Sequence, residues 1–303
     1  MITHHKNNDL ELSIISAIKN HSADKVVVYK EVFGEPIYLA YYLPKEYSCS
    51  SRYPVFVFVH GGSWSSHEIF PDQTCWQGDY LGYLARYYAE KGFVCVSIDY
   101  RLVRDQGQAE NYGVIDCYED CCDAMDYIIN HAGEYGIDTQ QMYLLGESAG
   151  GHLAGSCGIF WDDERIQKAI GKTNNNPNAM ILAYPVVTAI GPTHLLSFMN
   201  LTSITELTEE DKKAWSLELH VKPTCPPTFI VHAINDKTVP INNALCLAEA
   251  LSENSVDYEM HILPEGGHGF SLAENEVYKE DNPYVSRWVD WAIDWLKKIF
   301  INN

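Results

Sequence analysis

Short apolar runs alternate with amphipathic stretches along most of the chain. Runs of strand length fall at residues 54–59, 93–98, 142–145, 180–184, 228–232 and 258–263. Stretches with apolar positions at helical spacing fall at residues 76–91, 114–131, 209–219, 240–251 and 284–301. Continuous apolar runs are typical of strands buried on both faces, and their alternation with helices is typical of a parallel sheet. The pattern predicts an α/β fold with a mostly parallel central sheet and helices on both faces.

The chain before residue 54 has a different pattern. Residues 10–19 carry an apolar stripe at helical spacing, which predicts a packing helix. Strands are expected at residues 26–32 and 37–43, and the tyrosine-rich alternation of the second favours an antiparallel strand at the edge of the sheet. Tyrosines exposed there, near residues 38–42, would offer a surface for association, so an oligomer is one possibility.

Residues 186–227 interrupt the alternation. This stretch is rich in Ser and Thr and contains one clear helix, at about residues 209–219. Thr208 is its expected N-cap, with Asp211 as the partner in a capping box. We interpret the stretch as a small cap inserted into a single domain that spans residues 1–303, because the chain contains no internal repeat or convincing linker.

Charge and cysteine content exclude several classes of protein. The formal net charge of −20 disfavours binding to nucleic acid or to an anionic membrane, because like charges repel. No apolar run approaches the length of a transmembrane helix, and the first residues do not resemble a signal peptide. The nine cysteines form no disulfide framework, and Cys117, Cys121 and Cys122 lack a second ligand group for a metal. We therefore expect a cytoplasmic protein without a metal or other cofactor.

The stretch with the most chemical information is Gly146-Glu147-Ser148-Ala149-Gly150, a G-x-S-x-G pattern after a predicted strand. A strand–turn–helix of this kind places a serine on a strained bend with its hydroxyl exposed. Gly146 and Gly150 are expected where neighbouring backbone passes too close for a Cβ atom. Ser148 is therefore the candidate nucleophile, whereas Glu147 is assigned no chemistry.

A serine hydroxyl needs a histidine as general base, and the histidine needs a carboxylate to orient it. Of the 12 histidines, His268 is the best candidate because it lies in a glycine-flanked loop just after a predicted strand. His152 is expected to be structural, and His232 and His261 to be packed or partnered within strands. Asp236 directly follows a strand and is the candidate acid, and Asp257 and Asp281 are weaker alternatives.

An oxyanion that develops on the substrate needs preorganised N–H donors. One would come from Ala149, the residue after the nucleophile. Others would come from the loop after His60, in the sequence His60-Gly61-Gly62-Ser63-Trp64, where glycines allow the backbone to approach a substrate. This loop follows the predicted strand at residues 54–59, so it lies at the same edge of the sheet as Ser148.

Together these motifs resemble the hormone-sensitive-lipase-like and bacterial esterase/lipase branch of the α/β-hydrolase superfamily, over about residues 50–300. The resemblance also rests on the following motifs: Asp99-Tyr100-Arg101, Asp116 to Asp120, Pro226-Pro227-Thr228-Phe229, Asp236-Lys237-Thr238-Val239-Pro240 and Gly267-His268-Gly269-Phe270. It implies an α/β-hydrolase fold with Ser148, Asp236 and His268 as the triad. It also implies an oxyanion hole formed by the N–H groups of Gly62, Ser63 and Ala149. Many relatives have a third glycine where this chain has Ser63.

The implied activity is that of a serine carboxylesterase acting on a small ester. The chain also resembles acetyl xylan and feruloyl esterases, which remove acetyl or aromatic acyl groups from plant polysaccharides. The small cap favours short acyl chains, and an acylated oligosaccharide is one candidate substrate. Trp64 would then stack on a sugar or close the acyl pocket, or else pack in the core. The alternatives are a feruloyl-type esterase, a peptidase, and a non-catalytic binding protein of the same fold.

Overall fold

The computed structural model describes residues 23–64, 80–103, 112–191, 193, 207–272 and 282–300. At its centre is a sheet of eight strands in the order β1-β2-β4-β3-β5-β6-β7-β8. The strands are β1 (Lys25–Val32), β2 (Glu35–Tyr42), β3 (Tyr53–Val59), β4 (Val94–Ile98), β5 (Ile137–Glu147), β6 (Ala179–Ala183), β7 (Thr228–Ala233) and β8 (Tyr258–Leu263). The pairs β1–β2 and β2–β4 are antiparallel, and the other pairs are parallel. The predicted, mostly parallel α/β fold is confirmed.

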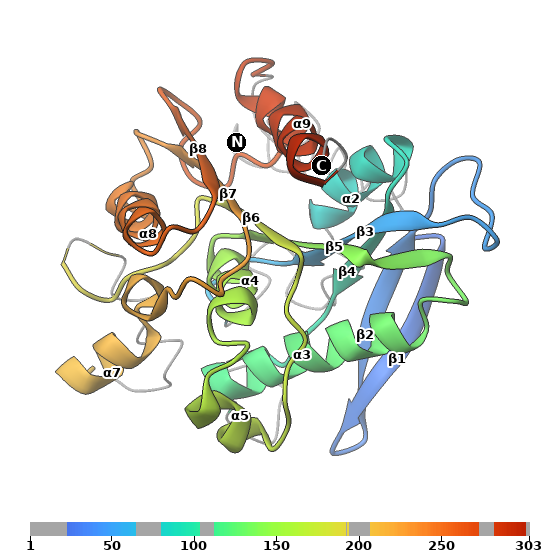
Figure 1. Ribbon diagram of the computed structural model, residues 1–303, viewed down its shortest axis with the longest axis horizontal. Helices are drawn as coiled ribbons and strands as arrows, with labels where there is room; N and C mark the ends of the chain where they lie inside the picture. Colours follow the sequence, from blue (N-terminus) through green and yellow to red (C-terminus); the bar gives the residue numbers. More distant parts are fainter. Residues whose placement is uncertain are drawn as a thin grey trace, which may run out of the picture.

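Helices cover both faces of this sheet (Figure 1). One face carries α2 (Tyr80–Glu90) and α9 (Trp288–Phe300), and the other carries α3 (Val114–Asn130), α4 (Ala149–Ile159) and α8 (Asn242–Glu253). Each face has its own cluster of buried apolar side chains. Trp288 and Trp295 are buried in one of these clusters and Trp291 packs against it, which confirms the expectation that the tryptophans of α9 form core.

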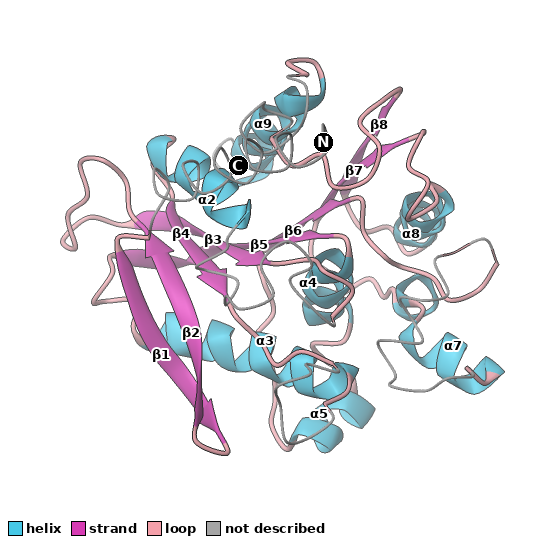
Figure 2. Ribbon diagram, turned by 180° about the vertical axis from the view of Figure 1, so that it is seen from behind, coloured by secondary structure: helices cyan, strands magenta, loops and turns pink. Residues whose placement is uncertain are grey.

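The expectation of exposed tyrosines at an edge near residues 38–42 is wrong. Strand β2 is antiparallel as predicted, but it pairs with β1 on one side and with β4 on the other. The edge of the sheet is β1, which forms a hairpin with β2 and lies beside α3 (Figure 2). Tyr41 and Tyr42 are fully buried in the apolar clusters on the two faces of the sheet, so these two tyrosines do not form an association surface.

Several element boundaries differ from the predicted ones. Strand β5 begins five residues before Met142, and the helix predicted at residues 209–219 divides into α7 (Glu209–Trp215) and a 3₁₀ turn, η1 (Leu217–His220). A second 3₁₀ turn, η2 (Val285–Arg287), precedes α9. Helix α5 (Glu164–Ile170) was not predicted, although Asp163 caps its N-terminus and Gly171, at φ 72°, ends it. The helix expected at residues 10–19 lies outside the described residues, as do the start of the one expected at 76–91 and residue Asp281.

The described part of the predicted cap lies between β6 and β7. Thr208 accepts a hydrogen bond from the N–H group of Asp211, and the Asp211 carboxylate accepts one from the N–H group of Thr208, which confirms the capping box. The segment packs on α4, because Leu217 is fully buried and a Cβ atom at Gly155 would lie 2.8 Å from its Cδ1 atom. The described part of this segment is thus packed on the core, and the cap stays a prediction.

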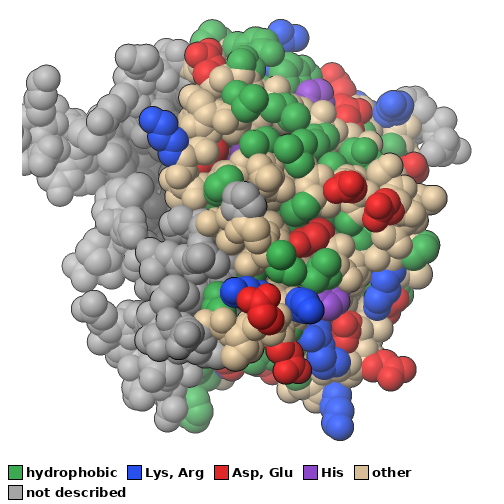
Figure 3. Space-filling model, turned by 90° about the vertical axis from the view of Figure 1, so that its left-hand side faces the viewer, with side chains coloured by type: hydrophobic (Ala, Val, Ile, Leu, Met, Phe, Trp, Pro, Cys, Tyr) green, Lys and Arg blue, Asp and Glu red, His purple; other side chains and the backbone are tan. Residues whose placement is uncertain are grey.

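The described helices include none with the length and apolar character needed to cross a membrane. On the face drawn in Figure 3, acidic side chains are interspersed with basic and hydrophobic ones. The charge of −20 is therefore not gathered into one patch on that face.

Candidate active site

Ser148 lies between the end of β5 and the start of α4, with φ 54° and ψ −118°. Such a positive φ is unusual for a residue with a Cβ atom and marks a strained backbone. A Cβ atom at Gly146 would lie 2.2 Å from the carbonyl oxygen of Gly150, and one at Gly150 would lie 2.0 Å from that of Val59. Both glycines are required by close backbone approach, as expected from the sequence.

The backbone of Ser148 is fixed by the neighbouring strand. Its N–H group donates to the carbonyl oxygen of Ala183, at the end of β6, over 3.1 Å. Its carbonyl oxygen accepts from the N–H group of Val186 over 3.1 Å and from that of His152 over 3.3 Å. These bonds hold the strained turn in place, so the direction of the Ser148 side chain is set by the sheet.

His268 reaches Ser148 from the loop after β8. Its Nε2 atom lies 2.8 Å from the Oγ atom of Ser148, and its ring packs edge-on against Tyr184 at 5.1 Å between centroids. Gly267 and Gly269 flank it at positive φ angles of 67° and 75°, which glycine adopts without strain. The glycine-flanked loop therefore brings the predicted base to the predicted nucleophile.

Asp236 holds the other side of the His268 ring. Its Oδ2 atom lies 2.7 Å from Nδ1 of His268, and its Oδ1 atom accepts hydrogen bonds from the N–H groups of Thr238 and Val239 over 2.8 and 2.9 Å. Burial opposes ionisation of this carboxyl, but hydrogen bonds from His232 and His268 outweigh it and hold the pKa of Asp236 well below its usual range. Asp236 is thus a carboxylate that can stabilise an imidazolium.

His232 is a second imidazole on this carboxylate. It is packed and partnered within a strand, as expected from the sequence, but its pairing with Asp236 was not predicted. It lies at the end of β7 with its side chain fully buried. Its Nε2 atom lies 2.9 Å from the carbonyl oxygen of Val239 and 3.3 Å from Oδ2 of Asp236. Two acceptors around Nε2 require the proton on that atom. The only signal in the sequence is its position four residues before Asp236.

The loop after His60 lies against Ser148. A Cβ atom at Gly61 would be 3.3 Å from the Cβ atom of Ser148. The next three residues, Gly62, Ser63 and Trp64, all have positive φ, at 93°, 53° and 57°. Ala149 begins α4, and the first N–H groups of a helix have no acceptor within it. The predicted donor segments therefore lie on two sides of the nucleophile.

The sequence of the chain matches the models of two protein families. Residues 39–251, which are more than half of the chain, match the family model described as BD-FAE. The chain belongs to the BD-FAE family. Residues 215–300 also match the model of the dienelactone hydrolase family. The α/β-hydrolase esterase family expected from the motifs is confirmed.

Curated relatives of this BD-FAE family member include three proteins of different lengths. The present chain is 33% identical to endo-1,4-beta-xylanase B of Butyrivibrio fibrisolvens over 53% of its own length. It is 23% identical to the probable carboxylic ester hydrolase LipM of Mycobacterium tuberculosis over 86% of the chain, and 29% identical to a probable isoprenylcysteine alpha-carbonyl methylesterase of Arabidopsis thaliana over 74%. The chain spans 25%, 59% and 46% of the lengths of these relatives.

Solved structures similar to the BD-FAE chain include two hydrolases. An acetyl ester-xyloside bifunctional hydrolase from Caldicellulosiruptor lactoaceticus has a TM-score of 0.74 and 23% identity, and the match covers 92% of this chain and 97% of that one. A Thermogutta terrifontis esterase with bound propionate has a TM-score of 0.72 and 26% identity, covering 92% and 96%. The first likeness shows the fold alone, and the second relates the chain to an esterase.

Trp64 has a different place in this BD-FAE protein from the one expected for a substrate-binding residue. Its side chain is fully buried in the core, and its ring meets His152 edge-on at 5.5 Å. This burial favours the core-packing interpretation over stacking on a sugar. His152 is also fully buried and its Nε2 atom lies 2.9 Å from the carbonyl oxygen of Trp215, which confirms its structural role. Burial lowers the pKa of His152 to about 4.

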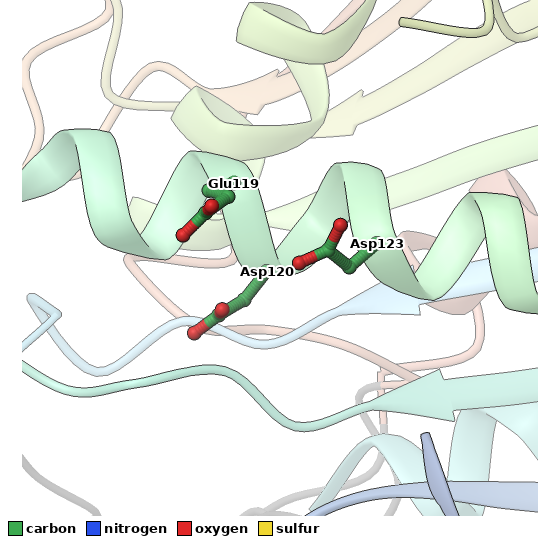
Figure 4. A group of neighbouring side chains, drawn as sticks. All are labelled: Glu119, Asp120 and Asp123. Carbon is green, nitrogen blue, oxygen red and sulfur yellow. The ribbon is translucent and has the colours of Figure 1, made fainter. Parts of the chain in front are cut away.

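Outside this site, three carboxylates of α3 come together at Glu119, Asp120 and Asp123 (Figure 4). The ammonium group of Lys30 lies 2.7 Å from Asp120, 2.6 Å from Asp123 and 3.2 Å from Glu119. It therefore stands where a bound cation would have to lie. The three carboxylates belong to an ion-pair network that joins β1 to α3.

Proposed function

We propose that this protein is a serine carboxylesterase that hydrolyses short-chain acyl esters through an acyl-enzyme on Ser148. The observation that carries the proposal is the continuous chain from Ser148 Oγ to His268 Nε2 at 2.8 Å and from His268 Nδ1 to Asp236 Oδ2 at 2.7 Å. Likeness to carboxylic ester hydrolases, and to an esterase that is phosphorylated by paraoxon, supports the same activity.

In the acylation step, His268 Nε2 takes the proton of the Ser148 hydroxyl as Oγ attacks the carbonyl carbon of the ester. The electron pair of the carbonyl double bond moves to its oxygen and gives a tetrahedral oxyanion. Asp236 stabilises the imidazolium that forms. When the oxyanion collapses, the bond to the alcohol oxygen breaks, and the imidazolium donates its proton to that oxygen.

Deacylation repeats these steps with water. His268 takes a proton from a water molecule, whose oxygen attacks the carbonyl carbon of the acyl-serine. The second oxyanion collapses, the bond to Ser148 Oγ breaks, and the proton returns to Oγ. The products are one carboxylic acid and one alcohol, and Ser148 is restored.

The N–H groups of Gly62, Ser63 and Ala149 are proposed to bind both oxyanions. The helix of Ala149 supports this role, because the N-terminus of a helix directs unpaired N–H groups and a partial positive charge at the nucleophile. The consecutive positive φ angles at Gly62 and Ser63 support it as well. Ser63 in place of a third glycine keeps the backbone donor, since only its N–H group is used.

The substrate class we propose is the acetyl ester of an oligosaccharide derived from xylan. The region shared with a xylanase of Butyrivibrio fibrisolvens supports a xylan-derived alcohol. Propionate and butyrate in the similar esterase of Thermogutta terrifontis support a short acyl group. We propose that the chain forms one domain with a cap at about residues 186–227. The free thiols of its described cysteines support action in the cytoplasm.

A panel of substrates at equal concentration tests this proposal. It contains acetylated xylo-oligosaccharides, methyl ferulate, p-nitrophenyl esters from acetate to decanoate, and an aminoacyl p-nitroanilide. We expect the highest kcat/KM on the acetylated sugar and the acetate ester, with a steep fall as the acyl chain lengthens. A preference for methyl ferulate would indicate a feruloyl-type esterase, preference for the anilide a peptidase, and no turnover at all a binding protein.

A further inference from the structure

Two loops run side by side behind the nucleophile. The Tyr100 hydroxyl donates to the carbonyl oxygen of His60 over 2.7 Å, and the Tyr100 ring stacks on the His60 ring at 4.1 Å and 9°. Three residues later, the N–H group of Val103 donates to the carbonyl oxygen of Trp64. The segment at residues 100–103 therefore holds both ends of the 60–64 loop, and the two proposed donors Gly62 and Ser63 lie between these anchors.

The segment that holds the loop is itself fixed to α3. Arg101 donates to Asp120 with its backbone N–H group over 2.8 Å, with Nε over 2.7 Å and with Nη2 over 2.8 Å. Its Nη1 atom also donates to Asp116 over 2.9 Å. A guanidinium bound by both oxygens of one carboxylate has its orientation fixed as well as its position.

Asp120 is the centre of this attachment, and nothing in ester chemistry requires it there. Its side chain is fully buried, and it lies 19 positions after Arg101 in the chain. Lys30 supplies a second cation to its Oδ1 atom over 2.7 Å, so the buried carboxylate is paired on both oxygens. Removal of either cation would leave a buried charge on Asp120 without full compensation. The ion pairs therefore favour one position of Arg101 over others.

We propose that Tyr100 is a positioning residue for the oxyanion loop, and that Asp120 holds Tyr100 in place through Arg101. Ser63 and Trp64, two consecutive residues other than glycine at positive φ, store strain that persists only where surrounding contacts over-determine the backbone. The Tyr100 hydrogen bond fixes the carbonyl group of His60, and with it the direction of the following peptide units. This inference rests on the proposed esterase function, since it concerns donors that matter only when an oxyanion forms.

The variant Tyr100→Phe tests the inference, because it keeps the ring stacked on His60 and removes only the hydroxyl. We expect kcat for p-nitrophenyl acetate to fall about 3- to 10-fold, the usual effect of losing one neutral hydrogen bond, with KM unchanged. The affinity for a trifluoromethyl ketone should fall by the same factor, because its adduct with serine carries an oxyanion. A merely structural role would lower the melting temperature without changing kcat or this affinity.

Tyr88→Phe is the matched control. It removes a buried tyrosine hydroxyl that donates to the carbonyl oxygen of Val289, on the opposite face of the sheet, over 3.3 Å. Its kinetics should equal those of the wild type. Asp120→Asn should reproduce the kcat loss, and its combination with Tyr100→Phe should lose less than the product of the two factors, because both act on one path.

The outcomes separate this inference from the proposed function. A wild-type protein that neither hydrolyses the ester nor binds the ketone would contradict the esterase proposal. An active wild type with a Tyr100→Phe variant of equal kcat and equal ketone affinity would overturn the positioning role. So would a loss confined to KM, or a double variant whose losses multiply fully.

Discussion

The Nε2 atom of His268 lies 2.8 Å from the Oγ atom of Ser148, although the two residues are 120 positions apart in the chain. Ser148 follows β5 and His268 follows β8, with β6 and β7 between them in the sheet. All of these strands are parallel, so their carboxyl ends lie at one edge. The contact is a consequence of the fold, and the catalytic proposal depends on it.

The proposed role of Asp236 as the acid of a triad is tested by Asp236→Asn. The amide presents N–H groups as well as an oxygen, so it can favour the wrong tautomer of His268, and it cannot stabilise an imidazolium. We expect kcat for an aryl acetate to fall about 10⁴-fold with little change in KM. Steady-state kinetics of the purified variant, with circular dichroism to verify folding, makes the measurement.

Asp257→Asn is the control for this prediction, because Asp257 is the weaker alternative acid, directly before β8, and its side chain is exposed. It should retain wild-type activity. If Asp257→Asn lost as much activity as Asp236→Asn, the assignment of the acid would be wrong.

The pH dependence follows from the groups around Ser148. Activity should fall in acid, because transfer of the serine proton needs a neutral imidazole and an imidazolium cannot accept that proton. Asp236 should not contribute, since hydrogen bonds from His232 and His268 overcome the effect of burial and keep its pKa well below the usual range. His152 should not contribute either, because burial lowers its pKa to about 4.

One protonation therefore limits the acid side of the profile. We expect log kcat/KM for an aryl acetate, measured between about pH 5 and pH 8, to fall towards acid with a slope that does not exceed one. A flat profile would be inconsistent with a histidine base, and a slope of two would show that a second group titrates with it.

The tight packing of the nucleophile turn predicts a large effect for Gly150→Ala. The new Cβ atom would lie 2.0 Å from the carbonyl oxygen of Val59 and 2.3 Å from that of His60. Backbone atoms cannot move aside without disturbing β3 and the His60 loop, so we expect the free energy of unfolding to fall by about 1–3 kcal/mol or more. Activity should fall with it. Urea unfolding, followed by circular dichroism, measures the change.

Gly133→Ala serves as the comparison, because a Cβ atom there would meet no atom within 4 Å. Its free energy of unfolding should stay within about 0.5 kcal/mol of the wild-type value. Equal stabilities for the two variants would show that the close approach at Gly150 is not a constraint on the fold.

Much of the fold and site could be predicted because the decisive signals are local. The G-x-S-x-G turn after an apolar run identifies Ser148 directly. The glycines around His268 and the strand before Asp236 identify the partners without any knowledge of distance. Parallel strands bring the residues at their carboxyl ends to one edge of the sheet whatever the details of packing. The order of the motifs and the positions of the strand ends were therefore enough to predict the members of the site.

The remaining features depend on contacts between residues far apart in the sequence, and no local sequence pattern indicates such contacts. The tyrosines of β2 alternate like those of an edge strand, but β2 pairs with strands on both sides, and Tyr41 and Tyr42 are buried in the apolar clusters on the two faces of the sheet. Trp64 is the last residue of the 60–64 loop. It has a positive φ angle, and its side chain is buried in the core. The pairing of Arg101 with Asp120 joins a loop to a helix through hydrogen bonds from the backbone and the side chain of Arg101 to one carboxylate. In the sequence, Arg101 and Asp120 belong to motifs that carry the family resemblance, but nothing in the sequence indicates that they pair.

The central claim is that Ser148 is the nucleophile. Its most direct test is to incubate the protein with paraoxon, which phosphorylates the similar esterase of Thermogutta terrifontis, and to locate the adduct by peptide mass spectrometry. We predict one diethylphosphoryl group per chain, on Ser148, with loss of esterase activity in proportion to labelling. Ser148→Ala should take up no label and should lose activity by about 10⁴-fold or more, whereas Ser156→Ala, in the α4 helix that follows Ser148, should label normally. A label on another residue, or ester hydrolysis that survives in Ser148→Ala, would contradict the account.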